Sequence, residues 1–313
     1  MTITTKLAAK GAVVLAVSAL ALSACTNASE AGGAPKPSSS GSAAATFDPS
    51  SVQKDDSLAS QVPAAIKSKG TLVVGSDTTY APAEFLAGAD SHTPMGFDVD
   101  FAQAIGATLG LKVDFETADF TGILPALGPK YDLGISAFTI TKERLQAVNF
   151  VSYTQAGTSW AVQKGNPKKF SVDDVCGKAI GVQTGTTEAD DLKAASDKCT
   201  AAGKKAIDIV SLDKQTDINT RLVNGALDAM SADSPVVAYA LTQTNGAIEK
   251  VGDTTDVALA GIAIAKGDTA LADLIQKTMA KLMADGTYKK ILDTWGNADG
   301  AIAKSEVNPS VPS

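Results

Sequence analysis

Residues 118–150 read ADFTGILPALGPKYDLGISAFTITKERLQAVNF. Two apolar runs in this stretch, Leu133–Ser136 and Val148–Val151, have the length and composition of buried strands. Between them, Thr141 precedes Arg144 by three residues, which is the spacing of a helix N-cap and its first turn. A strand, a helix and a second strand in so short a segment indicate an α/β fold.

The same alternation continues on both sides of this stretch. Apolar residues recur at helical spacing over residues 97–109 and again over residues 271–282. Strands that alternate with helices predict parallel sheets covered by helices. The other predicted strands are Leu72–Val74, Val113–Phe115, Ile180–Val182, Ile207–Val210 and Ala229–Ser231.

Length and charge restrict the class of protein. A chain of 313 residues with 44% apolar residues suits two lobes with appendages better than one compact domain. The formal net charge is −7, and removal of residues 1–24, which contain two lysines and no acidic residue, makes it −9. This acidity argues against nucleic acid as a partner. With one histidine and no phosphate-loop motif, we expect neither a metal site nor a cofactor.

The N-terminus has the pattern of a secretory signal peptide. Lys6 and Lys10 precede the apolar run GAVVLAVSALAL, which is too short to cross a bilayer comfortably. The next residues, Leu22-Ser23-Ala24-Cys25, resemble a bacterial lipobox, whose cysteine becomes the lipidated N-terminus of the mature protein. The alternative is an ordinary signal peptide with a chance cysteine. We expect cleavage after residue 24 and an acyl anchor, such as palmitate, on Cys25 at the extracytoplasmic face of the membrane.

A low-complexity segment follows this cysteine. Residues 26–50, TNASEAGGAPKPSSSGSAAATFDPS, contain almost no large apolar residues and so predict a flexible tether. We expect the tether to cover residues 25–57 with its lipidated cysteine. Folded structure should begin near Leu58 with a short helix that ends at Lys69, before Gly70.

Two cysteines remain once Cys25 is assigned to the anchor. Because an exported protein folds where disulfides persist, we expect Cys176 and Cys199 to pair. The alternative is two free thiols.

Six blocks of sequence, in order and in register, resemble the polar amino-acid-binding proteins of ABC importers, which are bacterial extracellular solute-binding proteins of family 3 related to glutamine- and histidine-binding proteins. The first block is LVVGSDTTYAPAEF and the last is ADGTYKKILDTWG. The blocks occupy residues 72–85, 96–115, 118–150, 177–190, 225–241 and 284–296.

The resemblance implies a periplasmic-binding-protein-like fold: two α/β lobes, a hinge of two strands and a ligand in the cleft between the lobes. Lobe 1 would contain residues 71–158 and 258–300, lobe 2 residues 159–257, and the hinge Ser159–Ala161 and Ala258–Ala260. Residues 301–313 would form a C-terminal tail. Such a protein is a monomer that captures a free amino acid and delivers it to ABC permease subunits with an ATPase.

The resemblance also implies the ligand contacts. Arg144 would clamp the ligand carboxylate, with Thr139 and the N-terminus of a helix at Thr186 and Thr187. Asp233 would pair with the ligand ammonium group. The full set of expected ligand-binding residues is Asp77, Tyr80, Phe120, Ala137, Thr139, Arg144, Gln183, Thr186, Thr187 and Asp233.

Each assignment has a purely structural alternative. Arg144 could be an exposed surface residue, and Asp77 a turn residue. Thr187 could be only a helix cap, with Asp190 completing a capping box. Tyr80 and Phe120 could belong to the core and contact no ligand.

Three departures from the family pattern leave the ligand open. Ala83 stands where relatives often have phenylalanine. Gln183 and Ala232 stand where some glutamine-binding members have lysine and histidine, respectively. Asp77 would repel a dicarboxylate side chain. We therefore expect a neutral polar, glutamine-like ligand first, a basic one second and glutamate third.

Two other functions compete with import. A lipoprotein that senses an amino acid for a receptor would have the same sequence features. A cyclohexadienyl-dehydratase-like enzyme of the same fold would need His92, which lies in the loop-like sequence ADSHTPMG. We expect no catalytic residues.

Overall fold

The computed structural model describes residues 47–87 and 92–311. The expected signal peptide, Cys25 and most of the expected tether lie outside the described residues. A mixed sheet has the strand order β5-β1-β6-β11-β7-β10-β8-β9. Its strands are β1 (Thr71–Ser76), β5 (Lys112–Thr117), β6 (Leu133–Gly134), β7 (Val148–Gln163), β8 (Ala179–Gln183), β9 (Asp208–Leu212), β10 (Ala229–Asp233) and β11 (Ile248–Ala265).

Helices cover this sheet, and a small antiparallel sheet lies beside it. The small sheet consists of β2 (Thr79–Tyr80), β3 (Glu84–Ala87) and β4 (Thr93–Met95). The α-helices are α1 (Asp56–Ser60), α2 (Ala64–Lys69), α3 (Phe97–Leu109), α4 (Phe120–Ile123), α5 (Lys142–Ala147), α6 (Thr187–Ala201), α7 (Gln215–Val223), α8 (Ser234–Gln243), α9 (Thr269–Ala284) and α10 (Thr287–Thr294). The 3-10 turns are η1 (Pro49–Ser51), η2 (Leu124–Ala126) and η3 (Ala298–Gly300).

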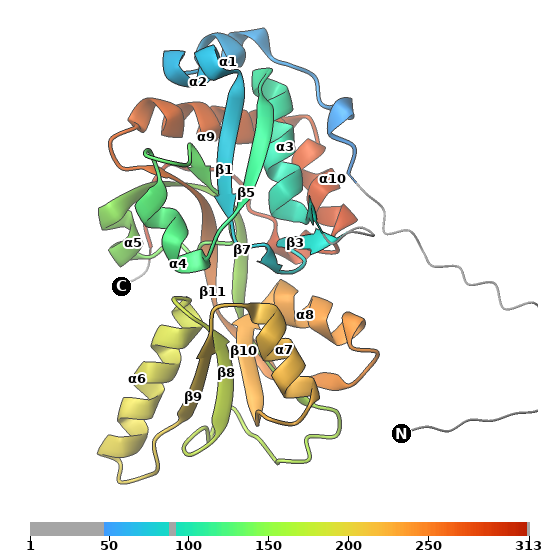
Figure 1. Ribbon diagram of the computed structural model, residues 1–313, viewed down its shortest axis with the longest axis vertical. Coiled ribbons are helices and arrows are strands. Elements are labelled where there is room, and N and C mark those ends of the chain that lie inside the picture. The colour runs from blue at the N-terminus through green and yellow to red at the C-terminus, as the bar shows by residue number, and fades with distance from the viewer. Residues whose placement is uncertain (1–46, 88–91, 312–313) are drawn as a thin grey trace, which may run out of the picture. The chain divides into compact units, whose positions relative to one another are not determined.

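Strands β7 and β11 connect the two lobes (Figure 1). They pair antiparallel along their length, and β6 joins β11 in lobe 1 while β10 joins β7 in lobe 2. The register shifts between Val251 and Thr255, between Thr255 and Ala258, and between Ala260 and Gly261. The prediction of parallel sheets therefore holds for each lobe's outer strands but is wrong for the two connecting strands. Thr158 and Ser159 already pair with β10, so the change of lobe along β7 comes before the expected Ser159–Ala161.

Each strand predicted from apolar runs is present, with shifted ends. β7 extends well beyond Val151, and β11 and the small sheet were not predicted as strands from periodicity. The expected helix ending at Lys69 is two helices, because Pro63 lacks the N–H that a continuous helix would need there. Gly70 and Gly110 end α2 and α3 in the left-handed conformation, with φ of 66° and 68°.

The folded part begins earlier than expected. Phe47 is buried in the main apolar core, and its ring lies 5.7 Å from the Nζ of Lys290 on α10. Asp55 caps α1 by accepting a hydrogen bond from the Leu58 N–H. The tether boundary at residue 57 is therefore wrong, because one phenylalanine in a polar segment has enough apolar area to anchor it.

The C-terminal residues also pack on lobe 1. Ser305 is buried and donates a hydrogen bond from Oγ to the Ser152 carbonyl at 2.7 Å. Val307 pairs with Val151, and Asn308 accepts a hydrogen bond from the Phe150 N–H. This segment therefore extends lobe 1 along β7 rather than forming a separate tail.

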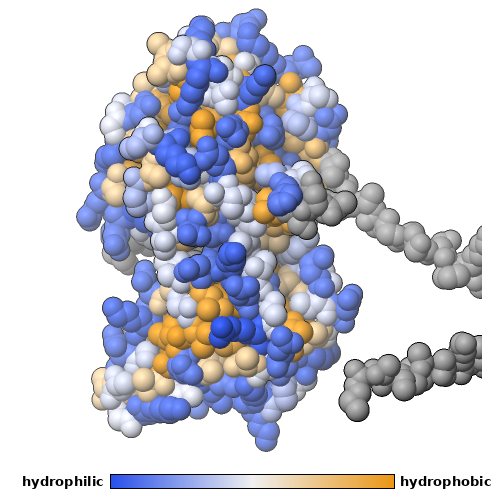
Figure 2. All heavy atoms as spheres, viewed as in Figure 1, coloured by the Kyte–Doolittle hydropathy of each residue, from blue (hydrophilic) through white to orange (hydrophobic). Residues whose placement is uncertain are grey.

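Apolar side chains are concentrated inside the lobes. Figure 2 shows hydrophilic residues over much of one face, with apolar residues gathered in places on both lobes. Among the described large apolar residues, Leu86 and Val257 are the exposed ones, at 36% and 62%. No helix in the described part of the chain is both long and apolar enough to cross a membrane.

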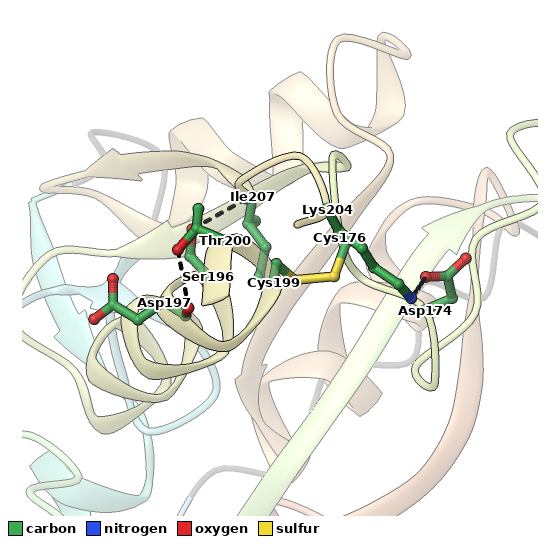
Figure 3. Close-up of a disulfide and its surroundings, with 8 residues drawn as sticks. All are labelled: Asp174, Cys176, Ser196, Asp197, Cys199, Thr200, Lys204 and Ile207. Atoms are coloured by element: carbon green, nitrogen blue, oxygen red, sulfur yellow. Dashed lines mark hydrogen bonds and ion pairs between the residues drawn. A yellow bond between two sulfur atoms is a disulfide. The ribbon is translucent and has the colours of Figure 1, made fainter. Parts of the chain in front are cut away.

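The predicted disulfide is present in lobe 2 (Figure 3). It joins Cys199, in the last turn of α6, to Cys176, in the segment before β8. The Ser196 hydroxyl, one turn earlier in the same helix, accepts a hydrogen bond from the N–H of Ile207, the residue before β9. Both links fix the C-terminal end of α6, while its N-terminal end stays free for other contacts.

Replacing both cysteines with serine should lower the free energy of unfolding of lobe 2. A crosslink over a sequence separation of 23 residues contributes about 3 kcal/mol by restricting the unfolded chain. Chemical unfolding of the non-reduced protein and of the Cys176→Ser/Cys199→Ser variant measures the difference. An equal effect of reductant on both proteins would contradict it.

Candidate ligand-binding site

The expected site residues come together at the junction of the two lobes. Every one of them except Asp77 lines a single narrow cavity. Ser136 and Glu188 complete its wall. The cavity wall thus consists of Tyr80, Phe120, Ser136, Ala137, Thr139, Arg144, Gln183, Thr186, Thr187, Glu188 and Asp233.

Arg144 lies in the first turn of α5 and points into the junction. Its backbone N–H donates to the Thr141 hydroxyl at 3.1 Å, so Thr141 is the N-cap that the sequence predicts. Its guanidinium donates to the carbonyls of Thr139, at 2.9 Å, and Gly185, at 3.0 Å. The guanidinium carbon lies 5.5 Å from the centre of the Phe120 ring. Arg144 is therefore a half-buried residue that spans both lobes and not a purely surface residue.

Burial lowers the pKa of Arg144, and the carboxylates of Glu188, Asp190 and Asp233 oppose this shift. An arginine stays charged under such conditions because its usual pKa is so high. The cavity therefore contains a permanent positive charge, on a guanidinium that has more N–H donors than the two bonds to the Thr139 and Gly185 carbonyls require.

The N-terminus of α6 forms the lobe 2 side of the cavity. Thr186 caps this helix, since its hydroxyl accepts a hydrogen bond from the Ala189 N–H at 3.3 Å. The alternative that Thr187 is the cap is wrong, because the chain is already helical at Thr187. The Thr187 hydroxyl is instead 3.5 Å from that of Thr139 in lobe 1. The helix N-terminus is thus directed at the same space as Arg144, an arrangement that favours an anion.

Asp233 lies at the end of β10, on the lobe 2 side of the cavity. Its backbone N–H donates to the Tyr80 hydroxyl at 3.1 Å. Burial raises the pKa of Asp233 well above its usual value, and the negative charge of Glu188 raises it further. Tyr80 and Arg144 oppose the shift. A cation placed between these carboxylates would relieve the cost of burying their charge.

Glu188 is the cavity residue that the sequence did not reveal. It is 3% exposed, and the Thr187 hydroxyl donates to its Oε2 at 3.3 Å. Burial raises the pKa of Glu188. An acidic residue in the first turn of a helix is common on solvated surfaces as well. The sequence signal that could have identified Glu188 as a site residue is its position directly after Thr186 and Thr187.

Asp77 is buried but does not line the cavity. Its carboxylate accepts hydrogen bonds from the N–H and hydroxyl of Thr79, from the Phe120 N–H and from the side chain of Gln183. The Gln183 contact is 2.9 Å long and crosses from lobe 2 to lobe 1. Asp77 is thus occupied by protein donors, and Gln183 connects the lobes at this point.

Tyr80 and Phe120 pack against the protein core and also face the cavity. The Phe120 ring stacks on Phe138 of the core at 4.7 Å, and Tyr80 is 6% exposed. Both also face the cavity. They can therefore exclude water from a ligand while they pack against the protein.

His92 lies outside this site. It is exposed beside β4 and is not part of the cavity wall. Among the described residues, no group of three or more histidine, cysteine, aspartate or glutamate side chains is arranged to hold a metal ion.

The chain matches a known family over most of its folded part. Residues 72–298 match the model of the bacterial extracellular solute-binding proteins, family 3. A family match of this extent defines the class, and the chain belongs to this family. The expected periplasmic-binding-protein-like fold is confirmed by the solved structures described next.

Two curated relatives are similar over most of their length. The arginine-binding protein ArgT of Corynebacterium glutamicum is 31% identical over 254 residues, which cover 80% of this chain and 82% of ArgT. The L-cystine-binding protein TcyJ of Escherichia coli K12 is 29% identical over 75% of this chain and 85% of TcyJ.

The similar solved structures include an ancestral arginine-binding protein. Bound to arginine, it has a TM-score of 0.66 and 36% identity, and covers 72% of this chain and 98% of its own. One bound to glutamine has a TM-score of 0.65 and 37% identity, with coverage of 73% and 98%. An ancestral amino-acid-binding protein that is a precursor of cyclohexadienyl dehydratase has a TM-score of 0.65 and 34% identity, with coverage of 74% and 97%.

Replacing the helix cap should distinguish the roles of the two neighbouring threonines. Thr186→Ala removes the acceptor for the Ala189 N–H and should lower the free energy of unfolding by about 1 kcal/mol. Thr187→Ala is the matched control and should cost less, since its hydroxyl does not cap the helix. Chemical unfolding of both variants tests this, and a larger loss for Thr187→Ala would reverse the assignment.

Proposed function

We propose that this protein is the extracytoplasmic substrate-binding component of an ABC importer for a polar α-amino acid, with a preference for a cationic side chain. The observation that carries the proposal is the charge of the cavity wall. One guanidinium, Arg144, faces the carboxylates of Glu188, which is buried, and Asp233, which is half-buried, between two lobes. The ligands named for the relatives support the same class of substrate.

A free amino acid carries both charges that this wall can pair. Each charge must exchange its water for protein partners when it is buried. In our proposal the carboxylate binds to Arg144, the Thr139 hydroxyl and the N-terminus of α6 at Thr187. The ammonium group binds to Asp233 and the carbonyl of Ala137. The two aromatic rings of the cavity flank the side chain of the ligand.

Glu188 changes the expected order of ligands. A neutral amino acid would leave two carboxylates to share one ammonium group. A second cation on the ligand would pair with the second carboxylate. Asp77, which was expected to repel a dicarboxylate side chain, already has protein donors, including Gln183. We therefore place a basic, arginine-like ligand first and a glutamine-like ligand second, the latter supported by the glutamine-bound neighbour.

Capture would require the lobes to separate. The cavity has room for about one water molecule, so an amino acid cannot enter while the lobes are in contact. The register shifts in β11 are suited to act as a hinge between lobe 1 and lobe 2. The ligand would favour closure by as much as its affinity for the closed form exceeds that for the open form.

The location and partners follow from the same proposal. Residues 1–24 would direct export, and an acyl chain on Cys25 would hold the protein at the extracytoplasmic face of the membrane. From there a monomer in its closed form would dock on permease subunits driven by an ATPase. A sensing lipoprotein remains the alternative, which a permease gene beside this one would disfavour. We propose binding without catalysis, since His92 lies outside the cavity.

Arginine should bind to the protein more tightly than glutamine, and Arg144→Ala should weaken both by about 30-fold or more. Removal of one partner from a buried charge pair costs at least about 2 kcal/mol. Calorimetry with the twenty amino acids measures this. The proposal fails if no amino acid binds more tightly than about 100 μM.

Glu188→Gln should weaken arginine binding by about tenfold or more and glutamine binding by less than about threefold. The reason is that only a ligand with two cations needs both carboxylates. Asp190→Asn is the matched control, because it makes the same change of charge at an exposed position of the same helix. Equal losses for both ligands in Glu188→Gln would contradict the role of Glu188.

A further inference from the structure

Two carboxyl groups lie beneath the ligand cavity in lobe 1. Glu84 of β3 and Asp98 in the first turn of α3 are both 0% exposed. Neither lines the cavity. They lie instead behind Ser136 and Ala137, which do line it.

Hydrogen bonds tie this carboxyl pair to the cavity wall. The Ser136 hydroxyl donates to Glu84 Oε1 at 2.6 Å and accepts from the Asp77 N–H at 3.0 Å. The Ala137 N–H donates to Asp98 Oδ2 at 2.8 Å, and the Tyr153 hydroxyl donates to Asp98 Oδ1 at 2.6 Å. Burial raises the pKa of Asp98 to about 6, and the hydrogen bonds that both of its oxygens receive oppose this shift.

The second oxygen of Glu84 has no such donor. Glu84 Oε2 is buried and receives no hydrogen bond from an N–H or O–H group of the described residues. Burial raises the pKa of Glu84, and the charge of Asp98 and a side-chain hydrogen bond between the two carboxyl groups raise it further. An ionised Glu84 would leave a buried, unpaired charge against a second carboxylate, which is costly. A proton on Oε2 lets Glu84 donate to Asp98 and removes both penalties.

Ala137 is held in an unfavourable conformation by this arrangement. Its φ is +45°, in the left-handed region that residues with a side chain seldom adopt. The hydrogen bond from its N–H to Asp98 fixes it there. A backbone conformation of this kind persists only where the surroundings enforce it.

We propose that Glu84 and Asp98 share one proton, and that this proton-linked pair positions Ser136 and Ala137 for binding the amino acid. Both residues act through the cavity wall and touch no ligand. The part that concerns binding rests on the proposed function, whereas the shared proton does not.

The surroundings of the pair are acidic on several sides. Burial and the charges of Asp98 and Asp77 raise the pKa of Glu84. Burial raises the pKa of Tyr153 and of Tyr80, and nearby carboxylates, Glu84 among them, raise both further. All of these neighbours are neutral or negative, so they favour retention of the proton on Glu84.

The stability of the protein should then depend on pH in a defined direction. The unfolded chain releases the Glu84 proton near the usual pKa of 4.5, while the folded protein retains it to higher pH. Stability from this site is thus fully present below pH 4.5 and is lost as the pH rises toward the raised folded pKa. One retained proton changes the folding equilibrium by up to about tenfold per pH unit.

Glu84→Gln tests the proton directly, because glutamine has the shape of a protonated glutamate and can donate to Asp98. Chemical unfolding of both proteins at pH 5, 6.5 and 8 gives their folding equilibria. We expect the folding equilibrium constant of the variant, divided by that of the wild type, to rise by at least about tenfold between pH 5 and pH 8. Parallel profiles of the two proteins would overturn the shared proton.

Amino-acid binding tests the positioning role. Asp98→Asn should bind the amino acid at least about tenfold more weakly, since it loses the carboxylate that holds Ala137. Glu84→Ala should also weaken binding, and Glu84→Gln should restore most of the loss. Unchanged affinity in Asp98→Asn would overturn the positioning role. If the wild type binds no amino acid, the proposed function fails, while the pH profiles still decide the proton.

Discussion

The antiparallel pairing of β7 with β11 is the constraint on which the other features depend. The pair runs from Val148 and Ala265 in lobe 1 to Gln163 and Ile248 in lobe 2. Each lobe adds its own parallel strands to one side of the pair. Because the irregular positions lie between the two ends, a small change of backbone angle there would move one lobe as a body in the proposed mechanism. The cavity lies where such motion would bring charged groups together.

Charge explains why the two lobes suit a small ionic ligand. Lobe 1 supplies Arg144, and lobe 2 supplies Glu188 and Asp233 with a helix N-terminus. Arg144 binds backbone carbonyls of both lobes, and the two carboxylates have raised pKa values. These are weaker substitutes for direct ion pairs in a buried site. A ligand with charges of both signs therefore gains most when it is enclosed by both lobes.

The sequence predicted those parts of the fold and site that leave a local signal. Gly110 and Thr141 mark helix ends, and Arg144 in a first turn conflicts with the helix dipole, which is a reason to suspect function. Glu188 looks like an ordinary first-turn acid, and Phe47 is one residue in a polar segment. Their burial depends on contacts distant in sequence. The hydrogen bond from Gln183 to Asp77 also depends on residues distant in sequence. It joins two residues that were each expected to contact the ligand.

The buried pair of Glu84 and Asp98 suggests a division of labour between the lobes. Lobe 1 has an internal network that fixes Ala137, and this network reaches β7 through Tyr153. Lobe 2 has no need of such a network for its threonines, because the first turn of α6 already orders their backbone. A rigid half with a preformed carboxyl-supported loop reduces the entropy lost on binding. In the proposed closure, lobe 2 then has only to deliver charges that are already held by its helix and strand ends.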